Sequence, residues 1–324
     1  QDGTPLCFLP DFRTRPHAYV KAWKHHAAQP EADRLNEIAS DRKEPFLSRY
    51  GGKVSAEWLF PKLWQILNEA PDVYQAMDRF MEATDWIVLQ LTGRERRSSC
   101  AAGYKALWSR RQGYPPDDFF KALDPRLERV VDEKLSRQIW PIGDKAGEIT
   151  PQAARMTGLL PGTAVAVGLV DAHVAAPAAG ITDAGQLLMI LGTSTCHMLL
   201  GRDEIPVPGI CGVVEDGVLP GYFAYEAGQN CVGDLFDWFV KNNVPPAYHQ
   251  EAVAQVEARN LPRDSELALC QVLGEGGAVL ASAPLTGHEA RCTLPLPTGQ
   301  RYYLLRVYQQ NGAFAVTAPV WMEG

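Results

Sequence analysis

The sequence contains no long hydrophobic run. No uninterrupted apolar stretch in its 324 residues approaches the roughly 18 residues that a membrane-spanning helix requires. The chain begins with Gln1 rather than methionine and shows no signal-peptide pattern. A composition of 46% hydrophobic and 21% charged residues is that of a soluble globular protein. We therefore expect no membrane partner and a cytoplasmic location.

Clustered positive charge is also missing. The chain has 31 Lys and Arg against 38 Asp and Glu, and its formal net charge is −7. Nucleic-acid surfaces depend on grouped Lys and Arg side chains. The one basic run, residues 94–97 with Arg110 and Arg111, is interrupted by Glu95 and is typical of a solvated face. The composition therefore argues against a nucleic-acid partner.

The cysteines lack the spacing of a metal site or a disulfide framework. All seven are scattered, without a C-x-x-C pair. His25 and His26 have no carboxylate or cysteine at metal-ligand spacing. This pattern favours reduced thiols in a cytoplasm and predicts no protein-built metal site.

Two apolar runs followed by polar residues are the most informative feature. Residues 164–167 lead to Asp171, and residues 187–191 lead to Gly192, Thr193 and Ser194. Two buried strands that each deliver polar groups at their C-terminal ends predict a site at the crevice of an α/β sheet. Asp171 is the candidate for chemistry, with a turn residue or helix cap as the alternative. The Gly192–Ser194 segment is either a tight turn or a phosphate-binding loop.

Helical periodicity dominates the first third of the chain. Apolar residues recur at i, i+3, i+4 and i+7 around residues 56–67, which predicts an all-helical layer with Trp58, Trp64 and Trp86 in its core. Small residues from Ser98 to Trp108 interrupt this pattern. Other expected elements are a strand at 6–9, helices at 19–26 and after Pro71, Asp85, Pro116 and Thr150, and a meander of strands at 198–200, 212–214 and 222–225.

The sequence pattern changes near the end of the chain. Pro245-Pro246 and a polar helix reaching Asn260 mark the expected boundary. Beyond it, the strand-like runs are 267–273, 278–285, 290–296, 302–308 and 314–321, and Asn311-Gly312 between the last two is a strong hairpin signal. We expect a small all-β module over residues 263–324.

Several motifs together resemble the FGGY carbohydrate kinases, and within them the ribulokinases most. They are G-x-x-D-A-H ending at 173, G-T-S-T-C-H at 192–197, A-T-D-W-I-V-L-Q-L-T-G at 83–93, A-G-Y-K-A-L-W at 102–108 and P-G-Y-F-A-Y-E-A-G-Q at 220–229. The likeness runs from Gln1 to about Val244. The tail from about residue 301 resembles the C-terminal β segment of PHP-type phosphoesterase proteins, without their metal-binding histidines, so no activity is transferred from it.

The FGGY resemblance implies an α/β fold: a partial two-lobed ribonuclease-H-like sugar kinase of the actin-like ATPase superfamily, followed by the all-β module. The implied segments are a partial N-terminal lobe at 1–181, the start of a C-terminal lobe at 182–262 and the tail at 263–324. It also implies an ATP- and Mg²⁺-dependent kinase that converts L-ribulose, or a related ketose, to its 5-phosphate in L-arabinose catabolism.

The same resemblance implies roles for individual residues. Asp171 would be the proton acceptor, and Gly192, Thr193 and Ser194 would hold phosphate. Lys105 and Glu226 would bind the sugar. From the residues alone, Lys105 could equally extend to the surface, and Glu226 could be a helix cap.

The sequence departs from the family pattern in ways that keep a second hypothesis open. An N-terminal Asp-x-Gly-Thr and a glycine-rich adenosine segment after Glu226 have no counterpart, and Leu169 stands where a polar residue is usual. The chain is expected to open within a domain, as a fragment or fusion, with unpaired strand edges that leave room for a homo-oligomer. The alternative is a non-catalytic sugar-binding or interaction protein without a complete ATP site.

Overall fold

The chain divides into two compact units, Gln1–Asp234 and Leu235–Gly324. The computed structural model describes residues 2–23, 25–192, 194–229, 232–243, 253–259, 265–300, 302–312, 314–316 and 320–321. The division between the units lies within the predicted middle segment, 182–262. The predicted boundaries at 181/182 and 262/263 stay predictions.

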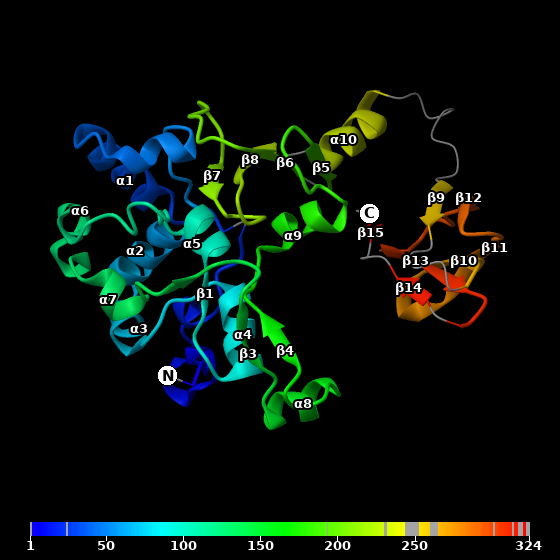
Figure 1. The fold of residues 1–324 in the computed structure, drawn as a ribbon, viewed down its shortest axis with the longest axis horizontal. Helices are drawn as coiled ribbons and strands as arrows, with labels where there is room; N and C mark the ends of the chain where they lie inside the picture. The colour runs from blue at the N-terminus through cyan, green and yellow to red at the C-terminus, as the bar shows by residue number, and fades with distance from the viewer. Residues whose placement is uncertain are drawn as a thin grey trace. The chain divides into compact units, whose positions relative to one another are not determined.

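Helices form one end of the first unit (Figure 1). The expected helix around residues 56–67 is α2, whose apolar side chains pack with Phe119 and Phe120 in the largest core cluster. The helices predicted after Pro71 and Pro116 are also confirmed. The helices of this layer are α1 (Gln29–Asp41), α2 (Leu59–Glu69), α3 (Pro71–Ala76), α6 (Asp117–Leu123) and α7 (Val130–Lys134), with short 3₁₀ turns at Pro45–Tyr50 and Pro125–Leu127.

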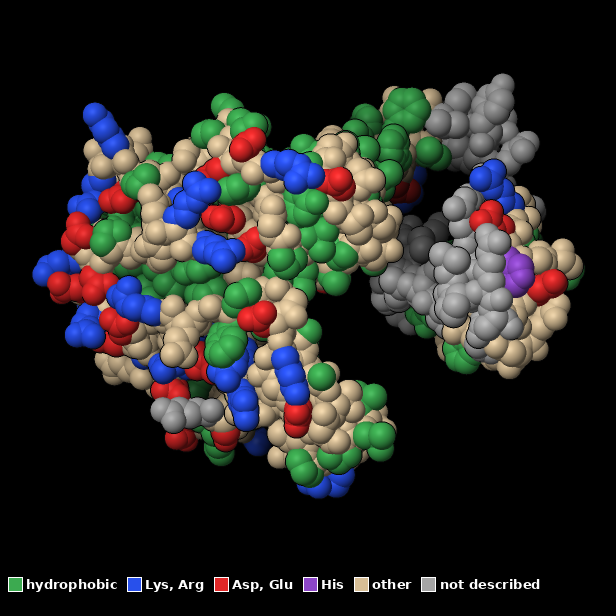
Figure 2. Space-filling view, viewed as in Figure 1, with side chains coloured by type: hydrophobic (Ala, Val, Ile, Leu, Met, Phe, Trp, Pro, Cys, Tyr) green, Lys and Arg blue, Asp and Glu red, His purple; other side chains and the backbone are tan. Residues whose placement is uncertain are grey.

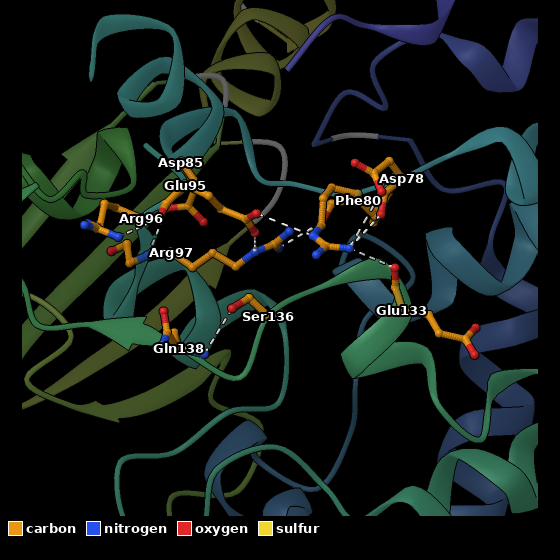
Figure 3. A network of polar contacts seen from close by, with 11 residues as sticks. Asp78, Phe80, Asp85, Glu95, Arg96, Arg97, Glu133, Ser136 and Gln138 are labelled. Atoms are coloured by element: carbon orange, nitrogen blue, oxygen red, sulfur yellow. Dashed lines mark hydrogen bonds and ion pairs between the residues drawn. The ribbon is translucent and has the colours of Figure 1, made fainter. Parts of the chain in front are cut away.

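A network of polar contacts around Arg97 connects this layer to the next elements (Figure 3). The Glu95 carboxylate accepts a hydrogen bond from Arg97 Nε at 2.8 Å and lies 3.4 Å from Arg79 Nε. Arg97 also donates to the carbonyl of Phe80 at 2.8 Å. These contacts hold the segment before α4 (Ala83–Thr92) against strand β1 (Arg97–Ser98), which pairs in parallel with β2 (Ile139–Trp140).

A four-stranded antiparallel sheet carries the second half of the first unit. Helix α5 packs on β7, and helix α9 contacts β5 and β6. The strand order is β5-β6-β8-β7, so β6 pairs with β8 and the predicted simple meander is wrong. The elements are α5 (Ser99–Lys105), α9 (Asp171–Ala178), β5 (Leu187–Leu191), β6 (Thr195–Gly201), β7 (Gly212–Glu215) and β8 (Phe223–Gln229).

The two apolar runs are not the buried, crevice-forming strands that were expected. The first run is β4 (Ala164–Ala166), which pairs antiparallel with β3 (Lys145–Glu148) and is exposed or half-buried. The second run is β5, which alternates exposed and half-buried side chains at the end of its antiparallel sheet. Among the described residues, each strand has one paired edge and one face toward solvent, which accounts for the exposure.

Four other local expectations are wrong. Residues 6–9 contain a 3₁₀ turn at Leu6–Phe8 instead of a strand, because prolines flank this run and cannot donate ladder hydrogen bonds. Residues 19–26 form no helix where they are described. The interrupted segment at 98–108 begins with helix α5, because Ser98 caps Cys100 N–H at 3.1 Å. The polar segment before Asn260 contains a strand, β9 (Val253–Arg259).

Helix ends in the first unit follow the sequence closely. Thr150 accepts a hydrogen bond from Ala153 N–H at 3.2 Å and caps α8 (Pro151–Thr157). Gly93 ends α4 with φ of +67° and Gly158 ends α8 with φ of +78°. Glycine takes this left-handed conformation without the penalty that a Cβ would bring.

The second unit is rich in β-strands, as expected for its tail. The predicted turn at Asn311-Gly312 joins β13 to its antiparallel partner β14, and Gly312 has φ of +85°. The core includes Leu267, Cys270, Val272, Leu285, Leu294 and Tyr303. The strands are β10 (Leu267–Leu273), β11 (Val279–Pro284), β12 (Glu289–Pro295, paired with β9), β13 (Tyr302–Gln309), β14 (Phe314–Val316) and β15 (Val320–Trp321), and α10 (Gly233–Asn243) spans the division between the units.

Charged side chains of both signs are mixed on the face of the first unit shown in Figure 2. Many form ion pairs, such as Arg42 with Asp118 and Arg137 with Asp132, both at 2.6 Å. No helix among the described residues is long and apolar enough to cross a bilayer. These observations are consistent with the mixed surface that the composition predicts.

Candidate functional site

The structure brings Lys105 and Glu226 together. Lys105 is the last residue of α5, and Glu226 lies in the middle of β8. Lys105 Nζ is 3.8 Å from Glu226 Oε2, and their side chains are only 18% and 12% exposed. An ammonium and a carboxylate at this depth need each other, because a buried charge without a partner is costly.

The ammonium of Lys105 also contacts the face of an aromatic ring. Lys105 Nζ lies 3.8 Å from the centroid of the Trp58 ring, which belongs to the helical core. A cation over an indole face is attracted to the negative potential of the ring. The prediction that Trp58 is a core residue is confirmed, but its contact with Lys105 was missed, because nothing in the sequence pattern relates the two residues.

His173 is a second residue that the sequence interpretation missed. Its side chain is fully buried, and its Nε2 is 3.1 Å from Glu226 Oε2. Its ring stacks on Tyr104, with 4.1 Å between the centroids. The thiol of Cys196 contacts the other oxygen of Glu226 at 3.9 Å. The D-A-H triplet was the available signal, because it places His173 two residues after Asp171.

These neighbours keep Glu226 ionised. Burial opposes its ionisation, but the Lys105 ammonium and the hydrogen bond from His173 outweigh burial and lower the pKa of Glu226 to about 2. Burial, and then the Glu226 charge, raise the pKa of Cys196 to about 12. At neutral pH the site therefore presents a carboxylate that accepts hydrogen bonds beside an ammonium that donates them. This combination suits a ligand with several hydroxyl groups.

Asp171 lies at the start of α9 and is exposed. Its Oδ1 accepts a hydrogen bond from Ala172 N–H at 2.9 Å. The helix-cap alternative does not describe this residue, because Val170 is the N-cap of α9, no side chain caps the helix, and Asp171 is its first residue with an exposed side chain. His173, two residues further along the same helix, contacts Glu226.

The turn between β5 and β6 contains the predicted phosphate-binding residues. Thr193 lies outside the described residues. Gly192 N–H donates to the carbonyl of Ser194 at 2.9 Å, and the Gly192 carbonyl accepts from Gly233 N–H at 3.1 Å. Gly233 is the first residue of α10, and its N–H group is used in this bond to the turn.

Two models of one protein family match the chain. The N-terminal domain of the FGGY family of carbohydrate kinases matches residues 7–177, and its C-terminal domain matches residues 187–288. The chain belongs to the FGGY family. The first domain contains Lys105 and Asp171, and the second contains Glu226. The second match ends at residue 288, inside the predicted tail and beyond Val244, near which the likeness was expected to end.

Curated FGGY relatives are similar over most of this chain. A ribulokinase of Bacillus licheniformis is 59% identical over 255 residues, which are 79% of this chain and 46% of the relative. A ribulokinase of Mycolicibacterium smegmatis is 51% identical over 282 residues, 86% of this chain and 49% of the relative. The chain therefore spans about half the length of the curated relatives that it matches.

Solved structures of sugar kinases share the fold. A xylulose kinase from Rhodospirillum rubrum gives a TM-score of 0.52 at 24% identity over 67% of this chain and 43% of that chain. A xylulose kinase from Bifidobacterium adolescentis gives 0.56 at 13% identity over 68% of this chain and 49% of that chain. These similarities show that the chain has the α/β fold of these solved sugar kinases.

The N–H groups of Gly192 and Gly233 at the β5–β6 turn are both used in backbone hydrogen bonds, to Ser194 and Gly192 respectively. No group of three or more His, Cys, Asp or Glu in the described part of the chain could hold a metal ion. Mg²⁺ in kinases is bound largely through substrate phosphates and needs only one or two carboxylates.

A cavity of about 240 Å³ elsewhere in the first unit does not include the predicted site. It is lined by Arg49 and Arg111 among others. Arg111 is neutralised by Glu204 at 3.8 Å and Glu215 at 3.3 Å, so it offers little attraction for an anion. Neither Lys105 nor Glu226 lines this cavity.

Proposed function

We propose that this chain carries the sugar site of an ATP-dependent ribulokinase, which converts L-ribulose to L-ribulose 5-phosphate in the use of L-arabinose. The buried Lys105–Glu226 pair, which His173 contacts from the helix that begins at Asp171, is the observation that carries the proposal. The ribulokinase relatives support the choice of sugar. A cytoplasmic location is part of the proposal, and the six cysteines that the structure describes are all free thiols.

The residues divide the work between binding and proton transfer. Glu226 accepts hydrogen bonds from sugar hydroxyls, and Lys105 donates one to a sugar oxygen. Asp171 would accept the proton of the sugar hydroxyl to which the phosphoryl group of ATP is transferred, with ADP as the leaving group. When bound, ATP with Mg²⁺ supplies the phosphoryl group and neutralises its charge. Gly192 and Ser194 hold the turn that faces the phosphates, and a solved glycerol kinase with the same fold contains ADP.

A second candidate is a sugar-binding protein that does not transfer phosphate. The hydrogen bond of Gly192 N–H to Ser194 favours it, because this donor is then not free for a phosphate. The two candidates share the sugar site and differ only in turnover. Measuring binding and turnover separately distinguishes them.

The test combines calorimetric titration of L-ribulose with an assay of ATP-dependent phosphorylation. Asp171→Asn should bind the sugar normally but lower kcat by about 10²–10⁴-fold, because the amide has no basic oxygen. Lys105→Met should weaken sugar binding by roughly 1.5–3 kcal/mol, the value of a hydrogen bond to a charged group.

Lys145→Met, at an exposed ion pair with Glu148, is the control and should change neither quantity. Full turnover in Asp171→Asn would leave Asp171 as the first residue of α9 without a role in proton transfer. Sugar binding without any turnover in the unsubstituted chain would favour the second candidate.

A further inference from the structure

His173 holds the carboxylate of Glu226 in one direction. Its Nε2 is 3.1 Å from Glu226 Oε2, within hydrogen-bond range. Lys105 Nζ is 3.8 Å from the same oxygen, too far for a hydrogen bond, so Lys105 contributes charge without direction. The Cys196 thiol, at 3.9 Å from Oε1, is a weak donor. Of these three neighbours, His173 alone gives the carboxylate a short, directional contact.

The proton needed for this bond can be assigned. Glu226 is ionised and therefore only accepts hydrogen bonds, so Nε2 of His173 must carry the hydrogen. Nδ1 of His173 is buried and has no hydrogen-bond partner in the described part of the chain. Buried polar atoms normally have hydrogen-bond partners, so an unpaired Nδ1 is unusual for a histidine with a purely structural role. The ring orientation thus gives Nε2 its hydrogen bond to Glu226 and leaves Nδ1 without one.

The surrounding contacts fix the ring itself. His173 stacks on Tyr104, the residue before Lys105 on α5. The Tyr104 hydroxyl donates at 2.7 Å to the carbonyl of Ala224, two residues before Glu226 on β8. His173 also belongs to α9, which begins at Asp171. One side chain therefore joins the three elements that carry the sugar-binding pair and the proton acceptor.

We propose that His173 is a positioning residue for sugar binding. Its Nε2–H sets the orientation of the Glu226 carboxylate and, through α9, the position of this carboxylate relative to Asp171. This inference rests on the proposed function, since it assumes that Glu226 binds the sugar. His173 does not touch the sugar in this proposal. It acts through Glu226, so its loss should raise the Kd and KM for sugar while kcat at saturating sugar changes little.

Two substitutions separate the hydrogen bond from the ring. His173→Phe keeps an aromatic ring on Tyr104 but removes the donor. His173→Gln removes the ring but places an amide N–H near the position of Nε2. We expect His173→Phe to weaken L-ribulose binding by about tenfold or more, as loss of an orienting outer partner does in metal sites, and His173→Gln to restore most of it.

The control is His197→Phe. His197 is half-buried on β6 and pairs with Ala227, so it points to the opposite face of the sheet from Glu226. The same change of histidine to phenylalanine there should leave sugar binding unchanged. An equal loss in His197→Phe would show a general effect on the sheet and would overturn the proposal.

A second readout needs no sugar. In ¹⁵N spectra of the unsubstituted chain, His173 should carry its hydrogen on Nε2 and none on Nδ1. In ¹³C titrations, His173→Phe should raise the pKa of Glu226, because the charged form loses a hydrogen bond. A proton on Nδ1 alone, or a Glu226 pKa and an L-ribulose Kd both unaffected by His173→Phe, would overturn the proposal.

These readouts distinguish the two proposals. If the unsubstituted chain binds no L-ribulose, the proposed function fails. The tautomer of His173 and the pKa of Glu226 then still show whether His173 donates a hydrogen bond to Glu226. If His173→Phe does not fold, the tautomer of the unsubstituted chain and the sugar affinity of His173→Gln give the result. Weak sugar binding by a folded His173→Gln, with Nε2 unprotonated in the unsubstituted chain, would contradict the positioning role.

Discussion

Lys105 and Glu226 illustrate how this chain keeps charges inside. Each is mostly buried, and each has a partner that offsets its desolvation: the indole of Trp58 for Lys105 and the imidazole of His173 for Glu226. A buried ion pair adds little to stability by itself, because desolvation consumes most of the attraction. We infer that such a pair is retained for its function, which agrees with a sugar-binding role.

Asp85 has a buried carboxyl group whose effect on the free energy of unfolding depends on pH. Burial raises its pKa from 3.8 to about 7, while the Ser98 N–H group and Arg97 act in the opposite direction. The folded state therefore keeps a proton that the unfolded state releases between these two values. Stability falls as pH rises from about 4 to about 7. Asp85→Asn should remove this dependence and become more stable, relative to the unsubstituted chain, by roughly 2–4 kcal/mol between pH 4 and pH 8.

Urea unfolding of both proteins at pH 4, 6 and 8 measures this difference. The amide oxygen of asparagine can still accept the hydrogen bond from Ser98 N–H, so this contact is kept. Asp41→Asn, at an exposed position at the end of α1, is the control and should follow the unsubstituted chain. Parallel pH profiles for Asp85→Asn and the unsubstituted chain would show that Asp85 is ionised in the folded state.

Among the elements, helix α5 depends on a close approach to β7. A Cβ added to Gly103 would come within 2.4 Å of Val214 Cγ1. This glycine belongs to the A-G-Y-K motif, and the approach that it permits places Lys105 opposite Glu226. Gly103→Ala should therefore destabilise the protein by about 1–3 kcal/mol, despite the better helix propensity of alanine.

A double-mutant cycle with Val214→Ala checks this prediction by denaturant unfolding. Val214→Ala removes the side chain that the new Cβ would meet, so the combined loss should be smaller than the sum of the single losses by about 1 kcal/mol or more. Strictly additive losses would indicate that α5 moves away from β7 without a clash at Val214.

At the scale of the molecule, β5 is the exposed end of the sheet in the first unit. Within the described residues it pairs with β6 alone, and Leu187, Met189 and Leu191 are each more than half exposed. An exposed apolar strand at a sheet edge favours pairing with another chain. We expect concentration-dependent self-association, and we expect Met189→Lys to weaken it.

Sedimentation velocity over a range of concentrations measures this association. Met156→Lys makes the same change at an exposed position on helix α8, away from a sheet edge, and should have no effect. A monodisperse monomer at every concentration, or equal effects of the two substitutions, would contradict a role for the β5 edge.

Local features of this chain were determined by its sequence. The cap at Thr150, the glycine that ends α4 and the hairpin turn at Asn311-Gly312 all formed where the sequence placed them. Each depends on the conformational preference of a few adjacent residues. Family motifs likewise predicted the meeting of Lys105 and Glu226.

Tertiary structure alone decided the surroundings of the site. The partner of β6, the antiparallel pairing of β4 and the exposure of β5 depend on which segments lie side by side. The contact of His173 with Glu226 joins residues 53 positions apart, and that of Tyr104 with Ala224 joins residues 120 apart. Periodicity and caps describe only neighbours in the chain, so contacts between α5, α9 and β8 became visible only once these elements had packed around one core.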